Sequence, residues 1–230
     1  MSSPVIIALD YETQEETLRI AKQLDPKLCR LKIASTLFTH YGPSIIEALQ
    51  NLGFDIFLDL KYHDIPQQVA SACKQAAQLG VWMLTLHCSG GETMMRAARE
   101  ALDSIAGKKP LLVGVTVLTS LSTEDLHQIG YAESLIDTVL ALAKMAQHAG
   151  MDGVVCSAAE ASLLRKTLGD AFLLVTPGIR FADDPADDQK RVVTPELALA
   201  SGSNYLVIGR PITQAADPMA VLRKITSLIV

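Results

Sequence analysis

The sequence predicts an α/β protein built as a single (β/α)₈ barrel, the TIM-barrel architecture, with residues 1–230 forming one domain. Its 230 residues suit one such barrel, and the 49% of hydrophobic residues are enough for a large core. Short apolar runs with strand character alternate with helical patterns along the chain, which is typical of a parallel sheet covered by helices. Eight such units occur without a linker or a low-complexity tract, so closure into a barrel is favoured.

The individual elements follow from apolar runs and from the residues that stop helices. Gly53, Gly80 and Gly150 each end a helical pattern. Strands are expected at residues 5–10, 28–33, 54–60, 81–87, 111–119, 151–157, 171–177 and 204–209. Helices are expected at about residues 13–24, 44–52, 66–79, 91–105, 133–148, 158–168 and 195–200, and from 218 onward.

A doubly wound open sheet is the alternative architecture. It would favour a glycine-rich turn after the first strand, where a nucleotide phosphate could approach the backbone. The first strand here ends in Ala8-Leu9-Asp10-Tyr11 and has no GxGxxG pattern. We therefore prefer the closed barrel.

The composition limits the possible binding partners and the cellular compartment. The formal net charge is −5 and no run of Lys and Arg occurs, which argues against a nucleic acid or an anionic membrane as the partner. The four cysteines are widely spaced without a CxxC pair, as expected for reduced core thiols of a cytosolic protein. No apolar run is long enough to span a bilayer, and the N-terminus leads directly into a strand instead of a signal peptide. We expect a cytoplasmic protein.

The most informative stretch is the apolar strand at residues 54–60 and the turn that follows it. Because side chains alternate along a strand, Phe57, Asp59 and Lys61 should share one face, while aliphatic neighbours form the other. Asp64 lies just past the strand. Burying unpaired charges costs several kcal/mol per ion, so charges placed together in an apolar strand indicate a functional site. A structural ion pair is the other interpretation.

The barrel fold predicts that functional groups gather at the C-terminal ends of the strands. Polar residues stand at or near the ends of six expected strands: Asp10, Lys32, Asp59 with Lys61, His87, Thr119 and Gly209 with Arg210. Lower on the inward face, Arg30 and Asp55 are expected to form a structural pair at the barrel floor.

A phosphate site is predicted after the last two strands. The loops after strands seven and eight of such barrels commonly hold phosphate, and here each contains a glycine and an arginine, in Gly178-Ile179-Arg180 and Gly209-Arg210. The long charged segment 181–191 lies beside this site and is expected to act as a lid. Residues 120–131 are expected to cover the other end.

These motifs, in this order and spacing, resemble the orotidine 5′-phosphate decarboxylase family over essentially the whole chain. The motifs that carry the resemblance are Ala8-Leu9-Asp10, Leu31-Lys32, the run from Asp59 through Lys61, His63 and Asp64 to Pro66, His87-Cys88-Ser89-Gly90-Gly91, Val117-Leu118-Thr119-Ser120, Thr176 to Arg180, Asp188-Gln189, and Val207 to Pro211.

The resemblance implies a homodimeric barrel enzyme that converts orotidine 5′-monophosphate to uridine 5′-monophosphate and carbon dioxide without metal or organic cofactor, in pyrimidine nucleotide synthesis. It implies an array of Lys32, Asp59, Lys61 and Asp64, with Lys61 as the proton donor and Asp64 reaching the partner subunit's site. The other roles that it implies are ribose contacts by Asp10 and Lys32, a base contact by Thr119, lid contacts by Gln189, phosphate contacts by Arg180, Gly209 and Arg210, and an interface contact by Ile65.

One position departs from the family pattern. The family commonly has a threonine two residues after the proline of this motif, contacting the ribose across the dimer, whereas this chain has Gln68. The Gln68 amide is the candidate substitute for that contact.

Two rival functions remain open at this stage. A metal-dependent 3-keto-L-gulonate 6-phosphate decarboxylase or hexulose 6-phosphate synthase would share the DxKxxD motif, but would favour a glutamate where Lys32 stands. A catalytically silent phosphate-binding barrel would have no need of Lys61.

Overall fold

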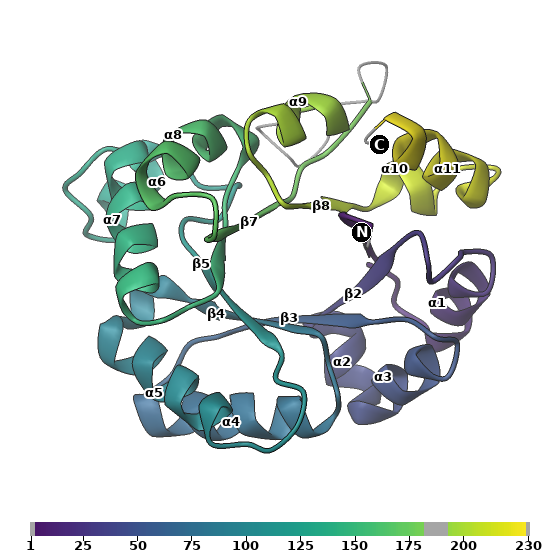
Figure 1. Ribbon diagram of the computed structural model, residues 1–230, viewed down its shortest axis with the longest axis horizontal. Coiled ribbons are helices and arrows are strands. Elements are labelled where there is room, and N and C mark those ends of the chain that lie inside the picture. Colours follow the sequence, from purple (N-terminus) through teal and green to yellow (C-terminus); the bar gives the residue numbers. More distant parts are fainter. Residues whose placement is uncertain (1–2, 182–192, 229–230) are drawn as a thin grey trace.

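The computed structural model describes residues 3–181 and 193–228, in which eight parallel strands close into a barrel (Figure 1). Each strand pairs with the next along the chain, and β8 pairs with β1. The predicted (β/α)₈ barrel is therefore confirmed, and the open-sheet alternative is excluded. The strands are β1 (Val5–Ala8), β2 (Arg30–Ala34), β3 (Ile56–Tyr62), β4 (Met83–His87), β5 (Leu111–Val115), β6 (Gly153–Val155), β7 (Leu173–Thr176) and β8 (Tyr205–Ile208).

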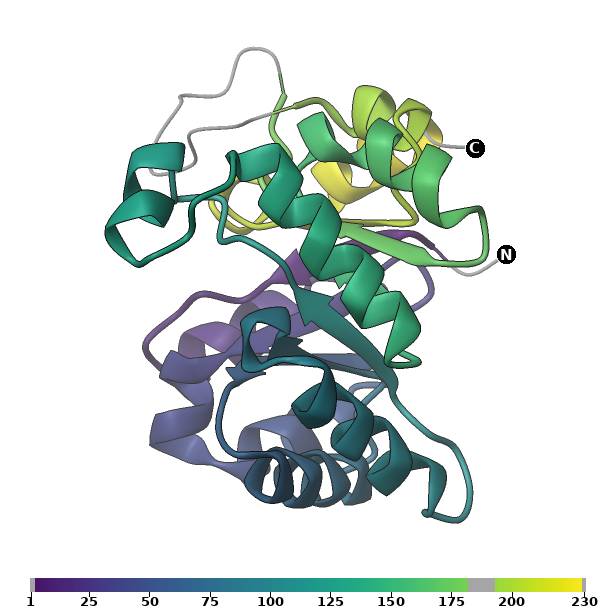
Figure 2. The same cartoon turned by 90° about the vertical axis from the view of Figure 1, so that its left-hand side faces the viewer.

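The helices surround this ring of strands (Figure 1). Helices α4 and α5 lie side by side on the outside of the barrel, as both views show (Figures 1 and 2). None of the described helices has the length and apolar character needed to cross a bilayer. The helices are α1 (Gln14–Ala21), α2 (Ser35–Tyr41), α3 (Pro43–Gln50), α4 (Pro66–Gln78), α5 (Glu92–Asp103), α6 (Thr123–Gln128), α7 (Leu135–His148), α8 (Ala158–Leu168), α9 (Pro195–Ala200), α10 (Arg210–Thr213) and α11 (Pro218–Leu228), with a 3₁₀ turn at Cys88–Gly90.

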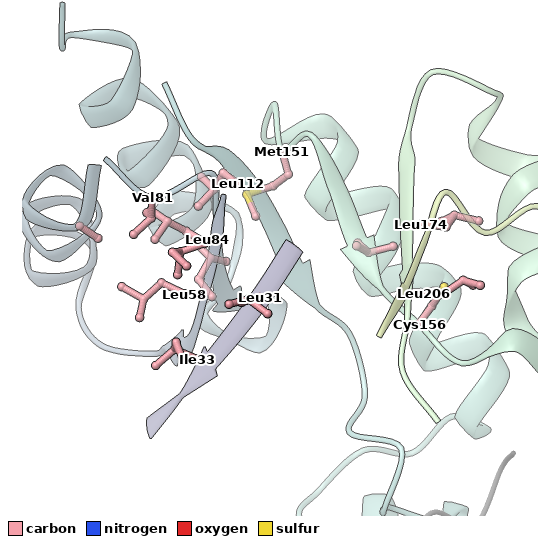
Figure 3. Close-up of a cluster of buried hydrophobic side chains, with 14 of the residues drawn as sticks. Leu31, Ile33, Leu58, Val81, Leu84, Leu112, Met151, Cys156, Leu174 and Leu206 are labelled. Atoms are coloured by element: carbon pink, nitrogen blue, oxygen red, sulfur yellow. The ribbon is translucent and has the colours of Figure 1, made fainter. Parts of the chain in front are cut away.

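Alternation of side chains along the strands produces two separate cores. The outer core lies between the strands and the helices, and Figure 3 shows part of it, including Leu31, Leu58, Leu84 and Leu174. All four cysteines are buried and unpaired, as expected. The inner core fills the barrel itself and consists of Ile6, Ala8, Phe57, Trp82, Met83, Val113, Val175 and Val207.

The barrel floor contains the predicted structural ion pair. Arg30 Nε lies 3.5 Å from Asp55 Oδ2, and the Arg30 guanidinium stacks 4.1 Å from the centre of the Trp82 ring. Trp82 in turn meets Tyr205 edge to face, and Arg30 donates a hydrogen bond of 2.7 Å to the carbonyl of Ser3. Pairing and stacking offset the desolvation of the buried guanidinium. The prediction of this pair is confirmed.

Three helices were not expected from the sequence. Helix α2 begins directly after β2, and no side chain caps its N-terminus. It is also short, ending before Gly42, so the sequence gives little sign of where it begins. Helix α6 lies within residues 120–131, the segment expected to cover the other end of the site, and the Ser122–Asp125 capping box is the sequence signal for its start. Helix α10 is a single turn after Gly209.

Candidate active site

A cavity of about 430 Å³ opens at the C-terminal end of the barrel, where predicted residues at or just after the ends of six strands meet. Asp59 and Lys61 project into it from β3 together with Phe57, so the face predicted for these three residues is correct. Apolar side chains, including Val115 and Val155, form much of the rest of its wall. The predicted site residues that line it are Asp10, Lys32, Asp59, Lys61, Thr119, Arg180, Gly209 and Arg210.

The centre of the cavity is a row of alternating charges. Asp59 Oδ2 lies 2.9 Å from Lys61 Nζ and 3.4 Å from Lys32 Nζ, and Lys32 Nζ lies 3.6 Å from Asp10 Oδ1. The side chains of Asp59 and Lys32 are each only 10% exposed, whereas those of Lys61 and Asp10 are 32% and 66% exposed. Each inner charge therefore has an opposite charge on both sides, which offsets its loss of water.

Asp59 is held in its ionised form. Burial alone would raise the pKa of this carboxyl group, but the charges of Lys32 and Lys61 oppose that effect. Hydrogen bonds from Lys61 and Thr85 act in the same direction, and the net result is a pKa below the ordinary value of an aspartate. At neutral pH the carboxylate is negative and keeps both lysine ammonium groups close to it.

The backbone is irregular at Lys61. Its φ of +52° lies in the left-handed region, and no other non-glycine residue of segments 3–181 and 193–228 adopts a positive φ. This conformation costs roughly 1–3 kcal/mol, so the surrounding structure must hold it in place. The Lys61 N–H donates to Thr85 Oγ1 at 2.9 Å, and Thr85 Oγ1 donates to Asp59 Oδ1 at 2.9 Å.

Thr85 was not identified from the sequence as a site residue. It is fully buried in the middle of β4, between Leu84 and Leu86. A single hydroxyl within such an apolar strand was the available signal, because a buried hydroxyl requires a partner. Strand alternation places it on the inward face, beside Asp59.

The opposite side of the cavity is basic. Arg180 follows β7 and is buried, with its Nη1 donating to the carbonyl of Ile179 at 2.9 Å. Arg210 follows β8 and is half-buried at the start of α10. Gly178 lines the same wall with φ of +78°, a conformation that disfavours any side chain. Two guanidinium groups beside a glycine that lines the cavity suit a phosphate.

His87, the polar residue at the end of β4, does not belong to this wall. It lies beside His63, with the ring centres 5.5 Å apart. Burial lowers the pKa of His87 below its ordinary value, and the nearby charges of His63 and Lys61 lower it further, against the opposing effect of Asp59. Of the residues that line the cavity, none is a histidine.

Three predicted site residues in the described part of the chain do not line the cavity. Asp64, Ile65 and Gln68 are exposed at the start of α4 and do not line it in the single chain. The Asp64 carboxylate accepts a hydrogen bond of 2.6 Å from the N–H of Ile65, whose residue is 64% exposed. Gln189 lies outside the described residues, as does the expected lid apart from Phe181.

The described part of the chain contains no group of three His, Cys, Asp or Glu side chains placed to hold a metal ion. Where two carboxylates do approach each other, Lys32 lies between Asp10 and Asp59. A lysine ammonium at that point repels a divalent cation.

Together, the barrel and its cavity define a (β/α)₈ enzyme with a lysine–aspartate array on one side of the cavity and two arginines on the other. Residues 3–225 match the model of the orotidine 5′-phosphate decarboxylase / HUMPS family, and the chain belongs to this family. The predicted family resemblance is therefore confirmed.

Similar proteins cover nearly the whole chain. An orotidine 5′-phosphate decarboxylase of Laribacter hongkongensis is 56% identical over 98% of this chain and 92% of its own length. One from Vibrio cholerae is 54% identical, and the match covers both chains completely. The crystal structure of orotidine 5′-phosphate decarboxylase from Lactobacillus acidophilus is 40% identical, with a TM-score of 0.89 and 99% coverage of both chains.

Proposed function

We propose that this chain decarboxylates orotidine 5′-monophosphate to uridine 5′-monophosphate and carbon dioxide, with Lys61 as the proton donor. The observation that carries the proposal is the Lys32–Asp59–Lys61 array in one cavity with Arg180 and Arg210. The names of the similar proteins support the same substrate.

The charge of the cavity supports an anionic substrate. Four cationic and two anionic side chains line its described part, a formal charge of +2 in a protein whose formal net charge is −5. A local excess of positive charge attracts a phosphorylated, carboxylated substrate. The phosphate would bind at Arg180 and Arg210, with Gly209 beside them, the ribose at Asp10 and Lys32, and the base at Thr119.

The proposed reaction breaks the bond between C6 of the pyrimidine and its carboxylate. The electron pair stays on C6 as carbon dioxide leaves, and Lys61 Nζ donates a proton to that carbon. An ammonium already held near C6 stabilises the developing negative charge without reorganisation. Asp59 holds Lys61 in place and, being negative, opposes the substrate carboxylate more than the transition state. Phosphate binding at a remote site supplies the energy that overcomes this repulsion.

Metal-independent catalysis is part of the proposal. The alternative is a metal-dependent enzyme of the 3-keto-L-gulonate 6-phosphate decarboxylase or hexulose 6-phosphate synthase type. The position of Lys32, 3.4 Å from Asp59 and 3.6 Å from Asp10, favours the metal-free reaction. We expect full activity in EDTA, and a requirement for added magnesium would support the alternative.

The decisive experiment follows absorbance during conversion of orotidine 5′-monophosphate by Lys61→Ala and by the matched control Lys166→Ala, whose lysine is exposed on α8. Loss of a general acid lowers turnover by about 10²–10⁴-fold or more, whereas the control should match the wild type. Binding of uridine 5′-monophosphate should remain measurable in both. Undiminished turnover in Lys61→Ala would exclude this residue as the proton donor.

We further propose a cytoplasmic homodimer in pyrimidine biosynthesis, whose second subunit brings Asp64, Ile65 and Gln68 to the cavity. The exposure of Ile65 and the absence of these three side chains from the cavity wall of one chain support this assembly. Mixed Lys61→Ala and Asp64→Ala subunits that exchange freely would form one intact site in each mixed dimer. Activity should then recover to about a quarter of the wild-type value for a two-fold symmetric pair. Proven mixed dimers without recovery would contradict a shared site.

A further inference from the structure

The pairing between β3 and β4 contains a bulge in β3. The register is regular up to Leu58 and resumes at Tyr62, so three residues of β3 stand opposite Thr85 of β4 alone. Two of these three residues are Asp59 and Lys61. Such bulges re-aim side chains and are frequent beside active sites. Here the bulge leaves Thr85 of β4 as the hydrogen-bond partner of the Lys61 N–H, which a regular ladder would have paired with a backbone carbonyl.

The Thr85 hydroxyl joins the two halves of the charged pair. Its oxygen accepts the Lys61 backbone N–H at 2.9 Å, which fixes the residue with φ of +52°. Its hydrogen goes to Asp59 Oδ1 at 2.9 Å, while Asp59 Oδ2 receives the Lys61 ammonium at 2.9 Å. The three groups form a closed hydrogen-bonded ring. Thr85 is fully buried and does not line the cavity, so it does not touch a bound substrate.

We infer that Thr85 is a positioning residue for the reaction, whose hydroxyl fixes the Lys61 backbone and the Asp59 carboxylate relative to each other. The inference rests on the proposed function, because the geometry that it preserves is that of the proton donor. Without the hydroxyl, the Lys61 N–H loses its partner and the carboxylate loses the contact that sets its rotation. Lys61 Nζ then lies less accurately over the reacting carbon.

The role predicts a loss in the chemical step and not in nucleotide binding. Arg180 and Arg210 follow β7 and β8, in parts of the chain that the β3 bulge does not include. Phosphate binding should therefore survive a change at Thr85. A displacement of about 1 Å of a reacting group can lower a rate by about 10²-fold. We expect kcat to fall by at least about tenfold, and KM and the Kd for uridine 5′-monophosphate to stay within about threefold.

Three variants test this. Thr85→Val keeps the shape of the side chain and removes the hydroxyl. Thr85→Ser and Thr85→Ala differ from each other only in the hydroxyl, so they decide the matter even where Thr85→Val does not fold. Serine should remain within about threefold of the wild-type kcat and alanine should fall at least about tenfold below serine. Thr17→Val is the matched control, because Thr17 is also fully buried but its hydroxyl donates to the carbonyl of Thr13, the N-cap residue of α1.

The measurements are kcat and KM with orotidine 5′-monophosphate, the Kd for uridine 5′-monophosphate by calorimetry, and thermal melting. A kcat for folded Thr85→Val within tenfold of the wild type, or equal rates for Thr85→Ser and Thr85→Ala, overturns the inference. So does a parallel loss of nucleotide binding, which would indicate general disorder of the site. Failure of the proposed function is distinguishable, because the wild-type protein itself would then not turn over the substrate.

Discussion

Replacing Asp59 with asparagine should destabilise the folded protein more than any other single charge change in the cavity. The substitution keeps the shape of the side chain and one oxygen for Thr85, but removes the charge between Lys32 and Lys61. The Lys61 side chain is 32% exposed and can turn toward water. The Lys32 side chain is 10% exposed and has no such route, so its buried charge keeps only the largely exposed Asp10 as a partner.

The size of the effect follows from this geometry. A pair of unit charges 3.4 Å apart attracts by about 5 kcal/mol at an effective dielectric constant of 20, and the desolvation of Asp59 offsets part of that. Removing one partner of a buried pair costs about 3–5 kcal/mol in measured cases. Because Lys32 keeps Asp10 as a partner at 3.6 Å, although at an exposed side chain, we expect the lower end, about 3 kcal/mol.

The assay is urea unfolding at pH 7, monitored by the fluorescence of Trp82, the single tryptophan of the sequence, with refolding to verify reversibility. Asp10→Asn is the matched control, since it removes a charge from the same lysine at a side chain that is 66% exposed. It should cost less than about 1 kcal/mol. Equal effects of the two substitutions, or a neutral Asp59→Asn, would refute the view that burial of Lys32 determines the loss.

Three further outcomes are expected. Because the pKa of Asp59 is lowered in the folded state, its contribution is present above its ordinary value of 3.8 and is lost as the pH falls through the folded pKa; the difference in unfolding free energy between Asp59→Asn and the wild type should persist at pH 6 and shrink below pH 3.8. The lowered pKa of His87 likewise makes the folded state lose stability as the pH falls below 6.5. The unfolding free energy of His87→Gln, measured in urea between pH 7.5 and 5.5, should therefore change less with pH than that of the wild type. An identical pH dependence would contradict the assignment. Gly153→Ala would place a Cβ 2.2 Å from the Leu173 carbonyl oxygen and should cost at least about 2 kcal/mol, against about 1 kcal/mol for Gly107→Ala, which has a positive φ but open space; similar melting temperatures for the two would contradict the steric argument.

The sequence was sufficient for the architecture because each strand–helix unit carries its own signal. The predicted helices at residues 158–168 and 195–200 match α8 and α9 at both ends. Seven of the eight strands were predicted too long, whereas the strand expected at residues 54–60 has the length of β3 but begins two residues too early. The run expected at residues 111–119 ends as a strand at Val115, because apolar residues that line the cavity, such as Val117, continue the pattern after the ladder stops. In the sequence, apolar residues that line the mouth of the barrel therefore look the same as apolar residues within a strand.

Most of the candidate site was also predictable, because barrel geometry brings strand ends together whatever the separation in sequence. Lys32 and Asp59, for example, are 27 residues apart, and their side chains lie 3.4 Å apart. Thr85 could not be predicted as a site residue because its role depends on the register between β3 and β4. It faces a bulge in the neighbouring strand, and a bulge arises from the pairing of two strands and not from the residues of either alone.

The β3 bulge and the charge array have a common physical basis. In a regular strand, residues two apart are separated by about 6.6 Å along the axis, so neighbouring side chains on one face run parallel. The left-handed Lys61 turns the chain instead, and its ammonium reaches back to the Asp59 carboxylate at 2.9 Å. Neither the backbone conformation nor the burial of these charges is a source of stability by itself. The fold tolerates both because Thr85 and Lys32 satisfy the groups that would otherwise be unpaired. The result is an ammonium directed into a cavity with a partly apolar wall.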